Sequence, residues 1–309
     1  MGKVIYYWSI DDRIIVPKGL FDAKINKNEW VSYTDENGET KKRGEITFET
    51  DVTRIGYMAF MGDSRLESIE LPDSISIIDD CAFKSCKNLK GITFKSDVKK
   101  IGKEAFCNCR SLTKIILPQS LEHIDDFAFK NSGIRLIKIP ESVYIIGLNP
   151  FLKCNALSFV ESSFAQNIGT CLVKDNELLW QTNSDRFVIH ENVYTLKAYS
   201  FNNNTSITSL NLINNEGIEY IENDAVANCS KLEVVDLPVN IKYIGNNAFG
   251  NCPNLYKVTL KSIIPPVITY NSFIGHADNF EIWVPKGSRD AYLNATDWEI
   301  YKDYIREVI

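Results

Sequence analysis

A small residue followed by an aromatic one recurs along this 309-residue chain at a nearly constant interval. Consecutive phenylalanines in the first four pairs are 23 residues apart. Phe151 and Phe201 are 50 residues apart, which indicates one degenerate unit between them. A repeat of this length indicates a solenoid, because one coil cannot bury its own apolar edge whereas stacked coils bury it together. The pairs and their variants are Ala59-Phe60, Ala82-Phe83, Ala105-Phe106, Ala128-Phe129, Pro150-Phe151, Ser200-Phe201, Ala225-Val226, Ala248-Phe249 and Ser272-Phe273.

Each unit carries further apolar residues at fixed distances from its aromatic residue. Ile55 precedes Phe60 by five residues, and Leu66 and Ile69 follow it. The spacing Leu-x-x-Ile-x-Leu ends with the alternation of a short strand that buries one face. The proline that often comes next ends the strand, because it has no N–H for the ladder. We therefore predict one short strand per coil, and a tight corner where Ile precedes Gly, as at Ile101-Gly102.

The stretch from Leu66 to Cys86, LESIELPDSISIIDDCAFKSC, resembles the repeat of the BspA-like leucine-rich repeat family. The resemblance extends over residues 46–285, and the segment from Ile282 to Ser288 is similar to the closing segment of that family. The resemblance implies a leucine-rich-repeat solenoid. It also implies a secreted or surface protein of a host-associated bacterium, with a role in adhesion to host or bacterial surfaces.

The repeat and its flanks predict one structural domain overall, a β-rich leucine-rich-repeat solenoid whose coils have about 23 residues. Residues 1–50 lack the repeat and contain a hairpin signal, so we expect an N-terminal β cap there. The solenoid itself is predicted over residues 51–285. Residues 286–309 are expected to form a short helical C-terminal cap, with Ser288 as the N-cap residue of a helix over Arg289–Asn294.

Residues 163–195 break the period of the repeat. Two strand-like stretches flank Asp175-Asn-Glu177, which predicts a hairpin inserted into the solenoid. One interpretation is a spacer that keeps the coils in register. The other is a bulge used for binding, with Trp180 as its anchor.

Five of the eight cysteines share one position of the repeat, three residues after the aromatic one. Asp63, Ser132, Asn204 and His276 fill that position in other units, so small polar side chains are expected to cap main-chain groups there. We predict a ladder of buried free thiols, and disulfides between stacked neighbours are the alternative. Cys81 and Cys171, outside this column, are expected to be partly exposed. The five cysteines of the column are Cys86, Cys109, Cys154, Cys229 and Cys252.

The sequence contains no constellation of residues that predicts catalysis, a metal site or a cofactor. The paired carboxylates Asp79-Asp80 and Asp125-Asp126 occupy the same slot of two repeats, which indicates a structural role rather than an acid–base pair. None of the three histidines has a partner at metal-ligand spacing. We therefore predict that the chain is not an enzyme.

The charge and the N-terminus bear on partners and location. The net charge is −6, which disfavours nucleic acid and anionic membrane surfaces as partners. No apolar stretch approaches the roughly 20 residues of a membrane span. Residues 1–10 do not resemble a secretion signal, so the protein is either cytoplasmic or has lost an export signal. The resemblance favours the cell surface or the extracellular space.

In each predicted strand, the residue between the last two buried positions faces outward. These residues are of mixed charge and polarity, which is also what an ordinary solvated face shows. A continuous sheet face is, however, a surface that solenoids offer to partners. On that interpretation Ile116, Phe159 and Trp283 are the apolar anchors, and Lys138 lies in the same column as Ile116. The column is Glu70, Thr93, Ile116, Lys138, Asn211, Asp236, Thr259 and Trp283.

These observations predict a non-enzymatic module that binds a protein or a glycan through one sheet face, without a cofactor. The expected ligands are host extracellular matrix or another bacterial surface. An intracellular scaffold or a secreted effector that uses the same face is the alternative.

Overall fold

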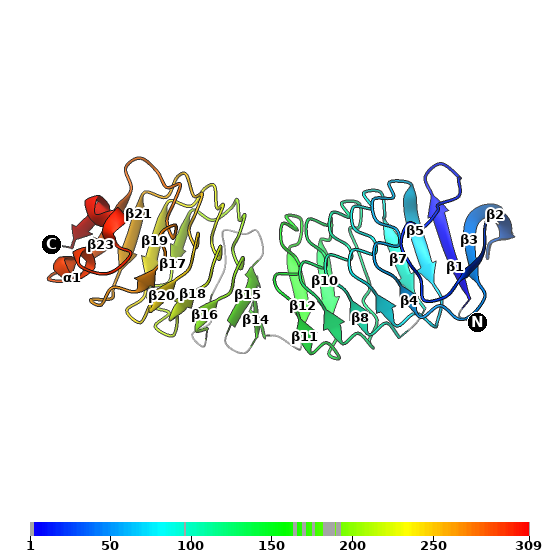
Figure 1. Cartoon of the computed structure of the whole chain (residues 1–309), viewed down its shortest axis with the longest axis horizontal. Helices are drawn as coiled ribbons and strands as arrows, with labels where there is room; N and C mark the ends of the chain where they lie inside the picture. Colours follow the sequence, from blue (N-terminus) through cyan, green and yellow to red (C-terminus); the bar gives the residue numbers. More distant parts are fainter. Residues whose placement is uncertain are drawn as a thin grey trace. The chain divides into compact units, whose positions relative to one another are not determined.

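The computed structural model describes residues 3–95, 97–162, 166–168, 171–174, 177–181, 189 and 193–308. For residue 159 and the described residues between 161 and 181, the description covers the main chain only. The chain forms two compact units, Met1–Phe164 and Ala165–Ile309. Within each unit the chain winds through successive coils that pair edge to edge, so the predicted solenoid is confirmed (Figure 1).

In the first unit, one side of the coils carries the longer strands, and the N-terminal strands extend the same sheet. The strand order is β2-β3-β1-β5-β7, with β1 antiparallel to both β3 and β5 and with β5 parallel to β7. A separate parallel pair, β10 and β12, follows. The bounds are β1 Val4–Ser9, β2 Ile25–Thr34, β3 Thr40–Phe48, β5 Leu66–Leu71, β7 Gly91–Phe94, β10 Leu136–Ile139 and β12 Phe159–Ser162.

A second side of the same coils carries strands of two residues each, in the parallel order β11-β9-β8-β6-β4. The second residue of each is the isoleucine that precedes the aromatic position by five, and in β4, β6, β8 and β9 it is buried. The bounds are β4 Arg54–Ile55, β6 Ile77–Ile78, β8 Lys100–Ile101, β9 His123–Ile124 and β11 Ile145–Ile146.

The third side consists of two consecutive turns around each aromatic residue. In most coils two residues, placed two before and two after the aromatic position, have positive φ angles; in the coil of Phe273 only Gly275 does. These two turns direct main-chain N–H groups toward the next coil. Phe60 N donates to Ala82 O at 2.7 Å, and Gly62 N donates to Lys84 O at 2.7 Å. All three sides therefore contribute hydrogen bonds between coils. The residues two after the aromatic position are Gly62, Ser85, Asn108, Asn131, Lys153, Asn203, Asn228, Asn251 and Gly275.

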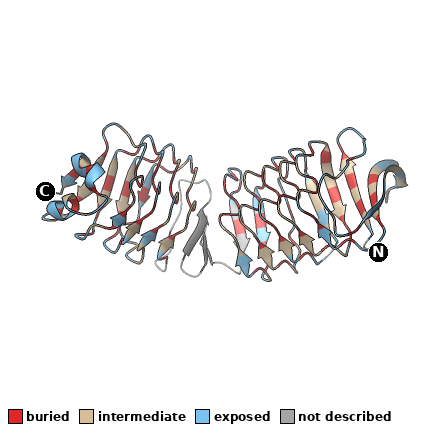
Figure 2. Cartoon of the chain, in the orientation of Figure 1, coloured by how far each residue is buried: buried red, intermediate tan, exposed pale blue. Residues whose placement is uncertain are grey.

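The aromatic residues form a stack inside the coils. Phe60, Phe83, Phe106 and Phe129 are fully or almost fully buried, and neighbouring rings lie 5.3–5.4 Å apart between centroids. The alanine before each ring is also buried and takes little space, which lets the coils approach. Figure 2 shows buried residues recurring along the coloured coils of both units.

The cysteine column lies beside this stack. The Cys86 thiol donates to Phe60 O at 2.9 Å, and the Cys109 thiol donates to Phe83 O at 3.1 Å. Each thiol thus satisfies the carbonyl of the aromatic residue in the preceding coil. The seven described cysteines are buried and unpaired, which confirms the prediction of free thiols. Cys81 was expected to be partly exposed, and this is wrong because Lys84 and Glu104 from neighbouring positions cover it. The side chain of Cys171 lies outside the description.

The second unit repeats this plan. Its longer strands form the sheet β17-β19-β21-β23-β24. A second sheet has the order β13-β14-β15-β16-β18-β20-β22, in which the first three strands come from residues 166–181 and the last four are the short strands of the coils. Within the break in the repeat, β13, β14 and β15 pair antiparallel, and β15 then pairs parallel with β16. The bounds are β13 Gln166–Ile168, β14 Cys171–Lys174, β15 Glu177–Gln181, β16 Thr195–Leu196, β17 Ser209–Asn211, β18 Tyr220–Ile221, β19 Val234–Leu237, β20 Tyr243–Ile244, β21 Lys257–Leu260, β22 Val267–Ile268, β23 Glu281–Val284 and β24 Ile305–Glu307.

The C-terminal residues close the end of the second unit. The short helix α1 (Arg289–Leu293) and the 3-10 helix η1 (Glu299–Tyr304) place the buried Trp298 ring over the last coil, where its Nε1 donates to Pro266 O at 2.9 Å. Ser288 occupies the N-cap position of α1, but its hydroxyl donates to Pro285 O and makes no cap hydrogen bond. The chain ends in a strand, β24, which the helical spacing of these residues did not predict.

Candidate binding surface

In the first unit, the outward side of the longer strands forms a surface that begins in the N-terminal strands β1–β3 and extends along the coils. In β1, Ile5 and Tyr7 are buried, so Val4, Tyr6 and Trp8 point outward. The register pairs Tyr6 with Glu70 of β5, and Glu70 with Thr93 of β7. We call this surface the outer face. It is defined by Tyr6, Trp8, Tyr33, Arg43, Glu70, Thr93, Ile116 and Lys138.

The cap part of the outer face is held by a cation–π arrangement. The Arg43 guanidinium lies 3.7 Å from the ring centroid of Tyr6 and 4.5 Å from that of Tyr33. Its Nε and Nη2 also donate to Glu45 at 3.1 and 2.9 Å. Such contacts fix the aromatic side chains before any partner arrives. These residues were not predicted from the sequence, although the alternation of Val4–Ser9 is a signal that places Tyr6 on the outside.

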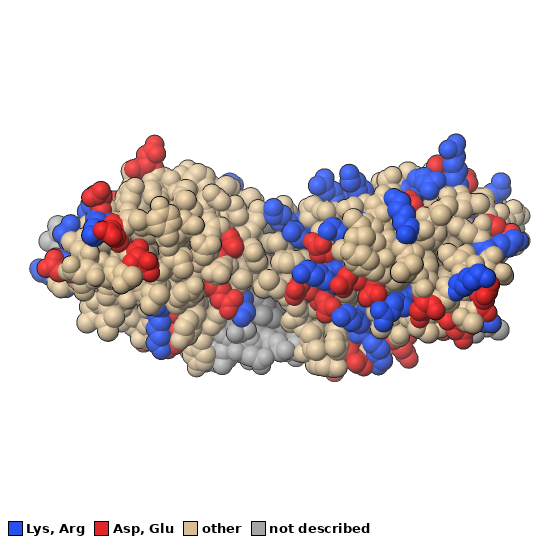
Figure 3. Space-filling view, viewed as in Figure 1, with Lys and Arg blue, Asp and Glu red and all other residues tan. Residues whose placement is uncertain are grey.

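Ion pairs between successive coils neutralise much of the surface charge. Lys90 pairs with Glu67 at 2.7 Å, and Lys99 pairs with Glu122 at 2.8 Å. The hydrogen bond from Lys99 lowers the pKa of the Glu122 carboxyl. Figure 3 shows charges of both signs interspersed over the first unit. Exposed ion pairs of this kind add little stability. A charged side chain without such a partner is therefore the better candidate for contact with a binding partner.

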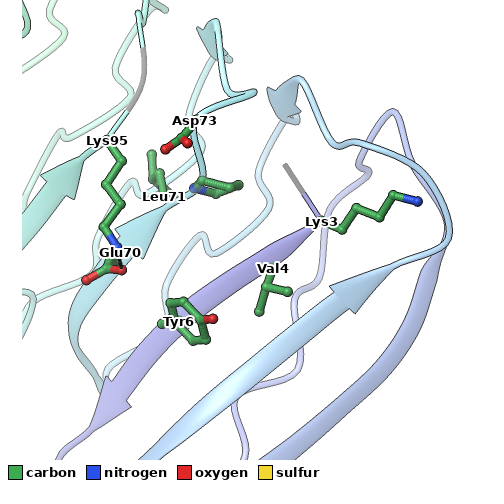
Figure 4. Close-up of a pocket in the computed structure, with 8 residues that line it drawn as sticks. Lys3, Val4, Tyr6, Glu70, Leu71, Asp73 and Lys95 are labelled. Carbon is green, nitrogen blue, oxygen red and sulfur yellow. Dashed lines mark ion pairs between the residues drawn. The ribbon is translucent and has the colours of Figure 1, made fainter. Parts of the chain in front are cut away.

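A first hollow lies where the cap meets the solenoid, and its volume is about 470 Å³. Glu70 and Lys95 form an ion pair at its edge, and that hydrogen bond raises the pKa of the Lys95 ammonium (Figure 4). Two lysines and two carboxylates balance the charge of the hollow. Its lining residues are Lys3, Val4, Tyr6, Glu70, Leu71, Pro72, Asp73 and Lys95.

A second hollow, which we call the groove, has a volume of about 460 Å³ and lies between β7 and the strand-like residues of the next coil. Ile116 stands beside it with 72% of its surface exposed. Ile92 on its floor is only half-buried, whereas Ile69 and Ile137 at the equivalent position of other coils are buried. The residues that line the groove carry two positive charges and no carboxylate. They are Lys90, Gly91, Ile92, Thr93, Phe94, Lys114, Ile115, Ile116 and Pro118.

The structure brings together two of the five predicted anchors. Ile116 and Lys138 are exposed on successive coils, since the Lys114–Leu136 bridge aligns them. Trp283 belongs to the second unit, where it is half-buried; its Nε1 donates to Glu281 at 3.1 Å and Lys257 Nζ lies 5.5 Å from its ring.

The main chain of Phe159 pairs with that of Leu136, and the main chain of Trp180 pairs with that of Leu172. The side chains of Phe159 and Trp180 lie outside the description, so their role stays a prediction.

The second carboxylate of each corner pair binds the main chain of the next coil, while Asp79 and Asp125 form ion pairs with Arg54 and Lys100. Asp80 Oδ1 accepts a hydrogen bond from Lys103 N at 2.8 Å, and Asp126 Oδ1 accepts one from Leu148 N at 2.7 Å. These contacts account for the repetition of acidic residues at this slot. Over the part of the chain that the structure describes, no three His, Cys, Asp or Glu side chains meet as metal ligands would.

The repeat of this chain matches that of a known protein family. The BspA type leucine-rich repeat region matches residues 39–158 and 175–280, in six copies. The chain belongs to the BspA-type leucine-rich repeat family. Members of this family use the solenoid described above, and leucine-rich repeats are commonly protein-interaction modules rather than enzymes. No curated protein is similar enough in sequence to count as a match.

Solved structures with the same fold support this BspA-type architecture. The pneumococcal vaccine antigen PcpA is 20% identical, with a TM-score of 0.58 over 94% of this chain and 97% of that one. A leucine-rich repeat protein from Eubacterium ventriosum is 18% identical, with a TM-score of 0.53 over 84% of this chain and 80% of that one. At these identities the similarity shows the fold alone. None of the helices in the described ranges has the length and apolar character that crossing a membrane would require.

Proposed function

We propose that this protein is a non-enzymatic binding module that holds a protein partner on its outer face, outside a bacterial cell. The observation that supports this most strongly is the exposure of Ile116. An aliphatic side chain that is 72% exposed in the middle of a solenoid face, beside an open groove, gains about 1.5–3 kcal/mol when a partner buries it. The preset Tyr6–Arg43 contact extends the same surface.

The family supports an extracellular location and an adhesive role, since one structural neighbour is described as a vaccine antigen. Host matrix proteins or the surface of another bacterium are the proposed partners, and a glycan is the competing ligand class. Buried unpaired thiols suit a reducing compartment as well as an oxidising one, so an intracellular scaffold or secreted effector is the alternative.

The test is binding of the purified chain to a panel of extracellular-matrix proteins and to a glycan array. Three variants accompany the wild type: Ile116→Ala with Lys138→Ala, Trp283→Ala, and Tyr57→Ala. Tyr57 is a matched control, because it is 54% exposed in the first unit but lies in a turn away from the strands.

Saturable binding to a matrix protein, lost only in the Ile116/Lys138 variant, is the expected result. Loss in the Trp283 variant alone would move the site to the second unit and overturn the choice of face. Binding to glycans only would overturn the proposed ligand class. Absence of any binding would favour the intracellular alternative.

A further inference from the structure

The sheet of the first unit is interrupted at residues 114–117. The strand order that begins at β2 ends at β7, and the next pair begins at β10. Between them, the only pairing recorded for Lys114–Leu117 among the described residues is one bridge, from Lys114 to Leu136. By contrast, β5 and β7 share a register of four residue pairs, as do β19 and β21 in the second unit.

The interruption is confined to the outer face. On the other sides of the same coils, β8 pairs with β9, and the rings of Phe83 and Phe106 keep their separation of 5.3 Å. Gly91 at the start of β7 contributes to the weakness of this edge, because a glycine within a strand offers no side chain for cross-strand packing. The coils therefore stay stacked on their other sides, while the strand ladder between the described residues 91–94 and 114–117 is missing on the outer face.

The interruption leaves main-chain groups of β7 without a strand partner. In a parallel ladder, successive residues direct their N–H and C=O groups to opposite edges of the strand. One edge of Gly91–Phe94 bonds to β5, and no pairing of the other edge with 114–117 is found in the described chain. An unpaired strand edge is the feature that proteins use to bind extended peptides.

The positive charge of the groove indicates that such a peptide would carry an acidic residue. Lys90 directly precedes β7 and Lys114 begins the strand-like residues of the next coil, so both stand at the same end of the groove, and no carboxylate lines it. Lys90 is paired with Glu67, whereas Lys114 is exposed and has no ion-pair partner among the described residues. At the other end the lining is apolar, with Phe94 and Pro118.

We propose that the groove binds an extended peptide segment of the protein partner, with an acidic residue beside Lys114 and apolar side chains against Ile92 and Ile116. The main chain of the segment would bond to the free edge of β7. This inference rests on the proposed function, because it names the part of the partner that the outer face recognises. An acidic, β-forming segment satisfies the charge, the apolar floor and the main-chain groups together.

The test uses the full chain and an array of immobilised seven-residue peptides. The peptides combine acidic, neutral or basic ends with alternating Val-Thr or Ser-Gly positions. We expect the acidic Val-Thr peptides to bind best. Binding should fall at least tenfold with Lys114→Glu, which should also shift the preference to basic ends, and at least tenfold with Ile116→Arg. Lys257→Glu is the matched control, since Lys257 is the equivalent residue of an intact ladder in the second unit, and it should bind like the wild type.

Hydrogen exchange provides a readout that does not depend on the peptide sequences. The amides of 91–94 and 114–117 should exchange faster than those of β19 and β21, and should gain protection when the best-binding peptide is added. Equal protection of both regions in the free chain, or peptide binding that Lys114→Glu leaves unchanged, would overturn the inference. If a matrix protein binds through Ile116 and Lys138 while the array shows no acidic preference, the inference fails and the proposed function stands. An acidic preference without any matrix partner would sustain the inference and overturn the proposed class of partner.

Discussion

The rings of Phe83 and Phe106 stack almost parallel, with centroids 5.3 Å apart and planes inclined by 4°. The two residues come from successive coils, and the main chain repeats the contact, since Phe83 N donates to Ala105 O at 2.9 Å. One position of the repeat thus supplies both the packing and the hydrogen bond that join one coil to the next. Several consequences of this geometry can be measured.

Replacing one ring of the stack should destabilise the first unit strongly. Phe106 is fully buried between two rings, so Phe106→Ala removes contacts on both sides and leaves a cavity. We expect a loss of about 3–5 kcal/mol in the free energy of unfolding, measured by urea denaturation. Phe106→Leu should cost less, and Tyr57→Ala, at an exposed position, should change little. A loss below about 1 kcal/mol for Phe106→Ala would show that the coils do not depend on the stack.

The thiol column should make stability fall in alkaline solution. Burial raises the pKa of Cys86 from the ordinary value of 9.0 to about 12. Below pH 9 the thiol is protonated in both the folded and the unfolded state, so its contribution is fully present. Between pH 9 and about 12 only the unfolded state releases the proton, and stability falls by about 1.4 kcal/mol per pH unit for this thiol. Urea denaturation at pH 8 and pH 10.5 measures this slope.

The control for this prediction is Cys86→Ser, which keeps a hydroxyl near Phe60 O but removes the titration. Its free energy of unfolding should be lower at pH 8 and should depend less on pH than that of the wild type. Equal slopes for the two proteins would contradict the assignment of the effect to this thiol.

Replacing the lysine that occupies a left-handed turn should stabilise the protein. Lys153 is exposed and has a φ of 61°, at a position where five other coils have asparagine. Because asparagine tolerates this conformation better than a long unbranched side chain, Lys153→Asn should stabilise the first unit by a few tenths to about 1 kcal/mol. Thermal unfolding would detect the shift. Lys153→Ala keeps the backbone conflict and should give no gain, so equal behaviour of both variants would contradict the argument.

The corner at Gly102 should not accept a side chain. A Cβ built there would lie 2.5 Å from Asp80 Oδ1 and 2.7 Å from the main chain of Asp79. Since Asp80 also accepts the hydrogen bond from Lys103 N, Gly102→Ala should cost roughly 1–3 kcal/mol of stability. Gly91→Ala is the matched control, because a Cβ at Gly91 meets no atom within 4 Å. Chemical denaturation of the two variants tests whether close contact, rather than loss of glycine, causes the effect.

The periodic residues predicted the fold well, because each buried position is repeated and every copy confirms the others. The strand at Leu66–Leu71, the corner at Ile101-Gly102 and the free thiol of Cys86 all follow from such copies. The left-handed turns were missed: Cys81 and Glu104 at the first turn are not usual turn residues, and the asparagines that recur at the second, such as Asn108, were a signal that could have found it. The final strand at Ile305–Glu307 was missed because its pairing depends on β23, not on its own sequence.

The candidate surface could be predicted only in part. The alternation of strand residues correctly placed Ile116 on the outside, and the structure shows it to be exposed. The interruption beside it was not predicted, since Lys114–Leu117 has the same alternation as the paired strands and Gly91 is the one sequence feature that weakens this edge. Whether two neighbouring coils pair on the outer face depends also on how they pair on their other two sides. The residues of one strand do not reveal this.

The division of each coil into copied interior and varied exterior has an evolutionary consequence. Phe83 and Phe106 pack against the rings of the coils next to them, so a duplication of one whole unit in the gene would add a coil without disturbing the packing of the rest. The outward position changes freely at the same time, as Thr93, Ile116 and Lys138 show. Selection can therefore alter what such a chain recognises by recombining units, while the determinants of folding are inherited unchanged.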